Sequence, residues 1–145
     1  MGRRNLETMR AVDLAWNERR WEDYASLLDD ELTVFASGKH RSHHKARHVA
    51  RAKAFCATFP DAHVNMTPYL DLFISHDGSK TCSVAALTGT MEGVIDRRNQ
   101  IIEPSRRRFS ITFMAICKWR NGKILEQREF FDTVLLARQL AIPTA

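Results

Sequence analysis

The sequence predicts an α+β fold in which helices come first and an antiparallel sheet follows. Up to Pro60, apolar residues recur at spacings of three and four, which is the period of an amphipathic helix. After Pro60 the chain is rich in Val, Ile, Thr, Phe and Leu, with stretches that alternate apolar and polar residues. Helices grouped before strands are typical of α+β proteins rather than of alternating α/β proteins.

Three helices are expected in the first part of the chain. The first covers Asn5–Asn17, with its first residue as a candidate N-cap, and a shorter helix covers Trp21–Leu28. A short apolar strand, Leu32–Ala36, comes next. The third helix runs from about Lys45 to Phe59 and ends there because Pro60 cannot continue it.

Four long strands are expected in the second part, and a short helix closes the chain. The strands cover His63–Ser75, Thr81–Glu92, Arg106–Arg120 and Lys123–Asp132, and the helix covers Thr133–Leu140. Asp77-Gly78 and Asn121-Gly122 separate neighbouring strands. These dipeptides are typical of two-residue hairpin turns, in which both central residues need a positive φ.

The length of one strand predicts a curved sheet. Arg106–Arg120 would span about 50 Å at ~3.3 Å per residue. Long strands twist and coil, so the sheet gains a concave face. The N-terminal helices are the elements able to cover that face, which places a pocket between helices and sheet.

Composition limits the class of protein. The 145 residues are enough for one ordinary domain, 1–145, and 44% hydrophobic with 27% charged residues is typical of a folded protein. No apolar run approaches the ~20 residues of a membrane-spanning helix, and no apolar segment follows the N-terminal arginines as in a secretory signal. Cys56, Cys82 and Cys117 lie in apolar stretches and form no CxxC pair, so we expect buried thiols in a cytoplasmic protein.

Several short motifs resemble one known family. They are Phe59-Pro60-Asp61, Thr88–Gly93, Asn121–Glu126, Phe131-Asp132 and Gln139-Leu140-Ala141. In this order they are similar to the SnoaL-like polyketide cyclases of the nuclear-transport-factor-2-like superfamily. The resemblance covers nearly the whole chain.

The resemblance implies a cone-shaped, cystatin-like α+β fold, in which a curved antiparallel sheet wraps around N-terminal helices. It implies a homodimer with a pocket for a small hydrophobic, carbonyl-containing molecule, and no metal or cofactor. In the cyclases an aspartate at the end of the last long strand is the general acid and base of an aldol ring closure, and Asp132 matches it. Met91 stands where the family often has His, and Ala141 replaces a Gly.

Alternation along the last strand makes Asp132 and Arg128 the candidate catalytic residues. Glu126, Arg128, Phe130 and Asp132 share one face, and a concave position would bring them into a pocket of low dielectric constant. Burial would raise the pKa of a carboxylate in that pocket, and Arg128 would offset its negative charge. In the alternative, Asp132 caps the following helix, and Glu126 pairs with Arg128 in solvent.

Seven residues are candidates for ligand contact. They are Trp16, Phe35, Asp61, Met91, Phe113, Glu126 and Phe130. The resemblance points to Trp16 and Met91, while Asp61 is either a residue of the pocket rim or an ordinary turn aspartate after Pro60.

Two other functions stay open at this point. One is a non-catalytic ligand-binding or dimerisation module. The other is epoxide hydrolysis, as in superfamily members that resemble limonene-epoxide hydrolase, which needs two carboxylates and an arginine around a water molecule. Arg128 and Asp132 would supply two parts, and Asp71 or Glu92 the third.

The segment His40–His48 is rich in histidine and in positive charge. His44 and His48 have the i, i+4 spacing of a zinc pair, but no acidic residue lies between Leu32 and Pro60, so we expect no metal. The net charge of +5 is compatible with anionic partners. We do not expect nucleic acid, because no aromatic residue interrupts these charges before Phe55.

Overall fold

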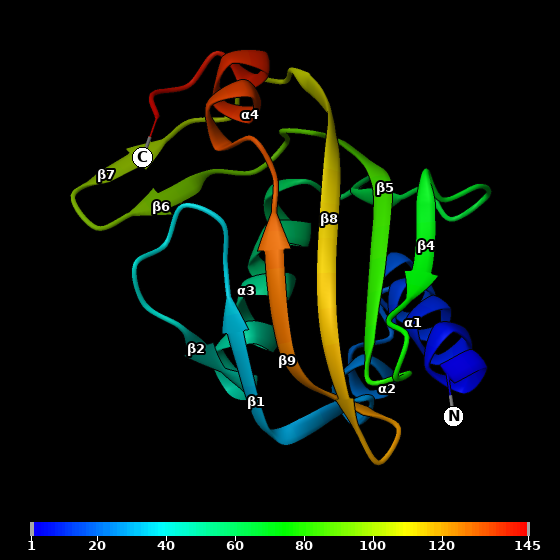
Figure 1. Cartoon of the computed structure of the whole chain (residues 1–145). Coiled ribbons are helices and arrows are strands. Elements are labelled where there is room, and N and C mark those ends of the chain that lie inside the picture. Colours follow the sequence, from blue (N-terminus) through cyan, green and yellow to red (C-terminus); the bar gives the residue numbers. More distant parts are fainter. Residues whose placement is uncertain (1, 145) are drawn as a thin grey trace.

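A computed structural model describes residues 2–144, which form four helices and nine strands (Figure 1). The helices are α1 (Gly2–Asn17), α2 (Trp21–Ser26), α3 (Lys45–Thr58) and α4 (Thr133–Leu140). The strands are β1 (Leu28–Phe35), β2 (His43–His44), β3 (His63–Val64), β4 (Asp71–Ile74), β5 (Lys80–Thr90), β6 (Ile95–Arg97), β7 (Gln100–Ile102), β8 (Arg108–Arg120) and β9 (Lys123–Phe130).

Seven strands form one curved sheet, in the order β2-β1-β9-β8-β5-β3, with β4 also paired to β5. The long strands β5 and β8 pair antiparallel from Lys80 opposite Lys118 to Thr90 opposite Arg108. The pair β1–β9 is parallel, which is the exception to the expected antiparallel arrangement. No hairpin turn joins β1 to β9, which lie far apart in the chain, so the connection does not require an antiparallel pair. A separate hairpin, β6–β7, forms a second small sheet.

The helices α1, α2 and α3 cover one face of the sheet, as the sequence predicts (Figure 1). Two apolar clusters lie between these layers, one around Leu28, Leu32 and Trp119 and the other around Phe59 and Phe109. Some side chains, such as Trp16 and Phe113, pack against both clusters. The α+β fold with N-terminal helices on a curved sheet is therefore confirmed.

Asparagine side chains hold the two ends of α1, one to the loop between β4 and β5 and the other to β3. Asn5 Nδ2 donates to the Gly78 carbonyl at 3.0 Å, so Asn5 lies inside the helix and is not its N-cap. At the other end, Asn17 Nδ2 donates to the Val64 carbonyl at 2.9 Å, and Asn17 Oδ1 accepts from the Val64 amide at 2.8 Å. These bonds hold α1 in a fixed position over the sheet.

The expected strands differ from the observed ones in several places. The helix expected to reach Leu28 ends at Ser26, and the strand expected at Leu32–Ala36 is β1, which begins at Leu28. The segment His63–Ser75 contains two short strands, β3 and β4, joined by a loop through Pro68, whose ring removes a backbone donor. The hairpin β6–β7 was not expected, since three-residue strands are too short for an alternating pattern to be recognised.

The two predicted turns differ in form. At Asn121-Gly122 both residues have positive φ, +51° and +75°, as a two-residue hairpin turn requires. Near Asp77, only Gly78 has a positive φ, and the Ser75 amide donates to the Lys80 carbonyl across a longer loop. The Asp77 carboxylate accepts three hydrogen bonds from Ser75 and Ser79, which holds that loop together.

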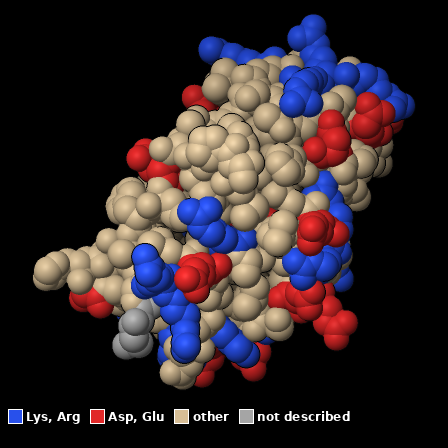
Figure 2. All heavy atoms as spheres, turned by 90° about the vertical axis from the view of Figure 1, so that its right-hand side faces the viewer, with Lys and Arg blue, Asp and Glu red and all other residues tan. Residues whose placement is uncertain are grey.

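The surface and the thiols agree with a folded domain of ordinary charge. Within residues 2–144 no helix is long and apolar enough to cross a membrane. The three cysteines are buried and free. On the face formed by α1 and β4, Lys and Arg side chains are interspersed with Asp and Glu side chains and with uncharged surface (Figure 2).

Candidate functional site

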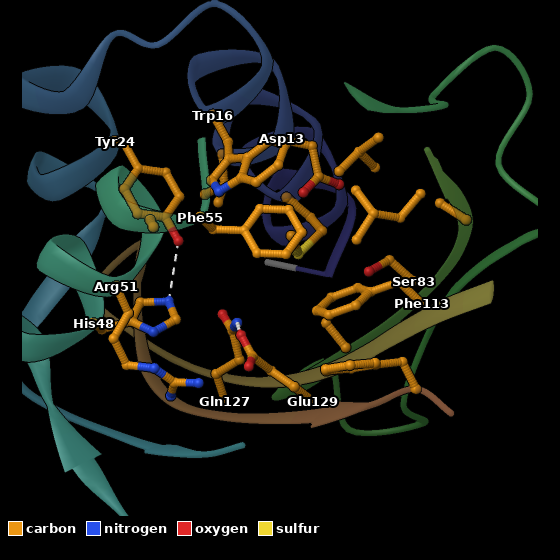
Figure 3. A pocket seen from close by; sticks show the side chains of 18 of the residues that line it. Asp13, Trp16, Tyr24, His48, Arg51, Phe55, Ser83, Phe113, Gln127 and Glu129 are labelled. Atoms are coloured by element: carbon orange, nitrogen blue, oxygen red, sulfur yellow. Dashed lines mark hydrogen bonds between the residues drawn. The ribbon is translucent and has the colours of Figure 1, made fainter. Parts of the chain in front are cut away.

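A cavity of about 160 Å³ lies between the helices and the covered face of the sheet (Figure 3). Its wall is mainly apolar, with Trp16, Phe55, Ile111 and Phe113 among the larger side chains. The polar groups come from several elements and are Asp13, Tyr24, His48, Arg51, Ser83, Gln127 and Glu129. An apolar cavity of about 150 Å³ can hold a molecule the size of benzene, so this one fits a small ring compound.

Asp13 brings a carboxyl group into the apolar wall. It lies on α1 between Met9 and Trp16, and helical spacing turns all three side chains toward the cavity. The Tyr69 hydroxyl donates to Asp13 Oδ2 at 2.7 Å. Burial raises the pKa of Asp13 to about 6, because desolvation of the carboxylate outweighs the stabilising hydrogen bond from Tyr69. A carboxyl with this pKa gains and loses a proton near neutral pH.

Glu129 supplies a second carboxyl group, on β9. Gln127 Nε2 donates to Glu129 Oε2 at 2.8 Å, and Gln127 Oε1 accepts from the buried Cys117 thiol at 3.7 Å. Burial raises the pKa of Glu129, while the Gln127 hydrogen bond and the charge of Arg51 act in the opposite direction. In Figure 3 Gln127 and Glu129 lie at the floor of the cavity, apart from Asp13 on the helix above.

A chain of hydrogen bonds leads from α3 to the cavity wall opposite Asp13. Arg51 Nη1 lies 3.1 Å from His43 Nδ1, His43 Nε2 lies 3.1 Å from His48 Nδ1, and His48 Nε2 lies 3.0 Å from the Tyr24 hydroxyl. Burial first, and then nearby positive charge, lowers the pKa of His43 to about 4 and that of His48 to about 3. Both imidazoles are therefore neutral at pH 7.

Strict alternation along β9 would turn Glu126 and Arg128 toward the cavity, but the opposite face of the strand lines it. Its register with β8 shifts between Ile124 opposite Trp119 and Glu126 opposite Lys118, so Leu125 is an extra residue. A bulge of this kind reverses the phase of the following side chains. Gln127 and Glu129 consequently face the cavity.

Arg128 and Glu126 lie on the outer face of the sheet. Arg128 Nε is 3.2 Å from Glu126 Oε1, and the guanidinium carbon lies 4.2 Å from the centre of the Phe35 ring. Phe35 and Phe130 are exposed on the same face, at 37% and 44%. The structure thus matches the solvated-pair alternative for Glu126 and Arg128, and it leaves all four side chains outside the cavity wall.

Asp132 is placed as the N-cap of α4. Its Oδ1 accepts a hydrogen bond from the Leu135 amide at 2.8 Å, and its side chain is not part of the cavity wall. The expectation that this carboxylate points into the pocket is corrected, because β9 ends at Phe130 and the chain then turns into the helix. A role of Asp132 in a reaction stays a prediction that mutation can test.

The residues proposed to complete an epoxide hydrolase site with Asp132 are not brought together. Arg128 is occupied by Glu126, Glu92 forms an ion pair with Arg106, and Asp71 is exposed on the edge strand β4.

Asp61 and Met91 have structural surroundings. Asp61 is exposed and accepts hydrogen bonds from the Thr90 amide at 2.6 Å and the Thr90 hydroxyl at 2.8 Å, which ties the end of α3 to the end of β5. These hydrogen bonds lower the pKa of Asp61 despite some desolvation. Met91 is fully buried in the second apolar cluster, and its sulfur accepts from the Ser105 amide. Neither residue lines the cavity, whereas Trp16 and Phe113 do.

His44 and His48, which have the spacing of a zinc pair, contact different partners. His44 Nδ1 lies 3.2 Å from the Leu32 carbonyl, and His40 is exposed. His48 instead contacts His43, with ring centres 5.3 Å apart. Within residues 2–144, no three His, Cys, Asp or Glu side chains are grouped as a metal site would need.

Sequence reasoning missed most of the polar residues of the cavity. Asp13 had a recognisable signal, since it is a charged residue inside the apolar stripe Met9, Val12 and Trp16. His48 similarly lies on the apolar line of α3, four residues before Ala52. No sequence signal marked the phase change that turns Glu129 inward.

These observations define the class of protein: helices packed on a coiled sheet around a mainly apolar cavity form a nuclear-transport-factor-2-like fold. A family model for "SnoaL-like polyketide cyclase" matches residues 6–140. The chain therefore belongs to the SnoaL-like polyketide cyclase family. No curated protein sequence matches the chain.

Solved structures share this fold at low sequence identity. A candidate SnoaL-like polyketide cyclase from Jannaschia sp. CCS1 has a TM-score of 0.83 and 16% identity, covering 99% of this chain and 95% of that one. AclR from Streptomyces galilaeus, a candidate hydroxylase, has a TM-score of 0.80 and 14% identity, covering 99% and 100%. A protein from Catenulispora acidiphila with a ketosteroid isomerase-like fold, in complex with trimethylamine, has a TM-score of 0.73 and 13% identity, covering 94% of each chain.

Proposed function

We propose that the chain binds a small apolar carbonyl compound in its cavity and moves a proton on the carbon next to the carbonyl, with Asp13 as the base. One observation carries this proposal. The Asp13 carboxyl, whose pKa desolvation raises to about 6, lies half-buried in the wall of a mainly apolar cavity. Such a group can remove a weakly acidic proton at neutral pH and return it.

The chemistry balances with the residues of this chain and the substrate. The Asp13 carboxylate accepts the proton, and the electrons of the C–H bond form an enolate. In an isomerisation, Asp13 returns the proton to a different carbon. In a ring closure, the enolate carbon bonds to a second carbonyl carbon of the same molecule, and the new alkoxide takes the proton from Asp13.

Family membership supports the carbonyl ligand. Polyketide cyclases act on chains that carry several carbonyl groups, and AclR is described as a hydroxylase, so the fold alone does not fix the reaction. The mainly apolar wall around the Asp13 carboxyl favours proton transfer on carbon over recognition of a charged substrate.

The test follows exchange of the methyl protons of acetophenone in D₂O by proton NMR. We expect the wild-type protein to accelerate exchange over buffer, with a rate that rises as Asp13 ionises around pH 6. The substitution Asp13→Asn should abolish the acceleration, and Asp71→Asn, an exposed carboxylate on β4, should leave it unchanged. Exchange that persists in Asp13→Asn removes Asp13 from the reaction.

Epoxide hydrolysis is the second candidate, because Asp13, Glu129 and Arg51 line the same cavity. Two carboxyl groups and an arginine are the groups that this reaction uses to activate a water molecule. The measurement is incorporation of oxygen-18 from labelled water into the diol formed from styrene oxide. Equal hydrolysis by the wild type and by Glu129→Gln would reject the role of Glu129. Binding of acetophenone without either reaction would leave a ligand-binding module.

We also infer a cytoplasmic homodimer. Three buried free thiols support a reducing compartment. The exposed Phe35 and Phe130 on the outer face of the sheet support self-association through that face. Light scattering after gel filtration should give twice the mass of one chain for the wild type and the mass of a single chain for Phe130→Lys. A monomeric wild type would refute the dimer.

A further inference from the structure

The direction of the hydrogen-bond chain Arg51–His43–His48–Tyr24 can be assigned from Arg51, the end of the chain that can only donate. A guanidinium group has donors and no acceptor, and Arg51 Nη1 lies closer to Nδ1 of His43, at 3.1 Å, than to Nε2, at 3.4 Å. The lone pair of His43 therefore belongs on Nδ1. Because His43 is neutral, its single ring proton is on Nε2.

The direction then passes along the chain. The Nε2 proton of His43 points at Nδ1 of His48, 3.1 Å away, so that atom accepts. Neutral His48 consequently carries its proton on Nε2, which lies 3.0 Å from the Tyr24 hydroxyl oxygen. The opposite direction would place the His43 proton on Nδ1, the ring nitrogen nearer to the positive guanidinium, which is electrostatically less favourable.

This direction leaves the Tyr24 hydroxyl proton without a protein acceptor. Tyr24 accepts from His48 through its oxygen, and among residues 2–144 the hydroxyl has no other hydrogen-bonding partner. Tyr24 is 4% exposed, and it lines the cavity (Figure 3). The free proton is therefore available to whatever occupies the cavity.

We propose that Arg51, His43 and His48 are positioning residues that make Tyr24 an obligatory hydrogen-bond donor to an acceptor oxygen of the bound molecule. This inference rests on the proposed function, which supplies a carbonyl compound as the ligand. Tyr24 and Asp13 lie on opposite sides of the cavity in Figure 3. When Asp13 removes a proton from the adjacent carbon, the carbonyl oxygen becomes an enolate oxygen, and Tyr24 stabilises its negative charge.

The direction of the chain can be read without any ligand. Two-bond ¹H–¹⁵N NMR at pH 7 distinguishes the two neutral forms of each imidazole. We expect the Nε2–H form for both His43 and His48 in the wild type and in Arg51→Lys, which keeps a donor-only cation. In Arg51→Met, a mixture of forms is expected. An Nδ1–H form of either histidine in the wild type overturns the proposal.

Ligand preference tests the consequence with two probes of the same shape. Acetophenone has a carbonyl oxygen where α-methylstyrene has a CH₂ group. We expect Tyr24→Phe to weaken acetophenone binding about fivefold and α-methylstyrene binding less than twofold, as protein NMR titrations would measure. Thr112→Val, which removes an exposed hydroxyl on the outer face of β8, is the control and should change neither. Equal effects of Tyr24→Phe on both probes refute the donor role.

The two proposals fail in different ways. If Tyr24→Phe removes the preference for acetophenone while no ketone exchanges protons, the donor role of Tyr24 is supported and the acid–base function is refuted. If Asp13→Asn abolishes exchange while Tyr24→Phe leaves both the preference and the exchange rate intact, the function stands and the donor falls.

Discussion

Replacing Asp13 by Asn should stabilise the fold at neutral pH. The folded-state pKa of Asp13 is about 6, against 3.8 for an unperturbed aspartate. At about 1.4 kcal/mol per pKa unit, ionisation of Asp13 lowers the free energy of unfolding by about 3 kcal/mol. Asn is neutral, and its carbonyl can still accept the hydrogen bond from Tyr69.

The sign of the pH dependence follows from linkage. Because the folded protein holds the Asp13 proton more tightly than the unfolded chain, this group costs stability as pH rises from about 4 to about 6. The substitution removes that cost. The gain in Asp13→Asn should therefore be near zero at pH 3 and about 3 kcal/mol at pH 7, equivalent to an increase in Tm of about 10 °C.

Thermal and urea unfolding at pH 4 and pH 7 measure the effect. The control is Asp71→Asn, which removes an exposed carboxylate of β4 and should change Tm by the same small amount at both pH values. A destabilised Asp13→Asn at pH 7, or a gain that does not depend on pH, would show that the Asp13 carboxyl is not desolvated and would remove the basis of its proposed role.

Three further outcomes are expected. Asp132→Ala should lower the free energy of unfolding by about 1 kcal/mol, because the Leu135 amide loses its acceptor. Asp132→Asn keeps the cap and should retain wild-type stability and proton exchange. Loss of exchange in Asp132→Asn would return Asp132 to the mechanism. Gly89→Ala should cost about 1–3 kcal/mol in urea unfolding, since its Cβ would lie 2.7 Å from a Phe109 ring carbon, and an unchanged midpoint would contradict this packing. In an Asp13→Asn background, Tm should fall as pH drops below about 6.5, because His48 has a pKa of about 3 in the folded protein and resists protonation there. Adding His48→Gln should reduce this fall in Tm. An identical fall would contradict the burial of His48.

Local chemistry made most of the fold predictable. Helical spacing located α1 and α3, and Asn121-Gly122 located the turn between the two last strands, because these signals act within a few residues. The limits of β3 and β4 were not accessible. Their ends depend on where β5 offers free backbone groups, which is a property of the paired sheet and not of the segment itself.

The site was less predictable than the fold for a physical reason. Alternation assigns a face only relative to a chosen residue, and the extra residue Leu125 reverses that assignment for Gln127 and Glu129. Nothing in the local sequence requires this bulge. Asp13 illustrates the other limit, since its pKa results from a cavity built by residues far along the chain.

The two fastenings of α1 have a mechanical consequence. Asn5 anchors the helix to Gly78, and Asn17 anchors it to Val64, with about 18 Å of helix between the anchors at 1.5 Å per residue. A helix held at both ends cannot rotate away from the sheet about one end. A molecule therefore has to enter the cavity through movement of other segments. We therefore expect the distance between the Asp13 carboxyl and the sheet to stay the same when a ligand binds.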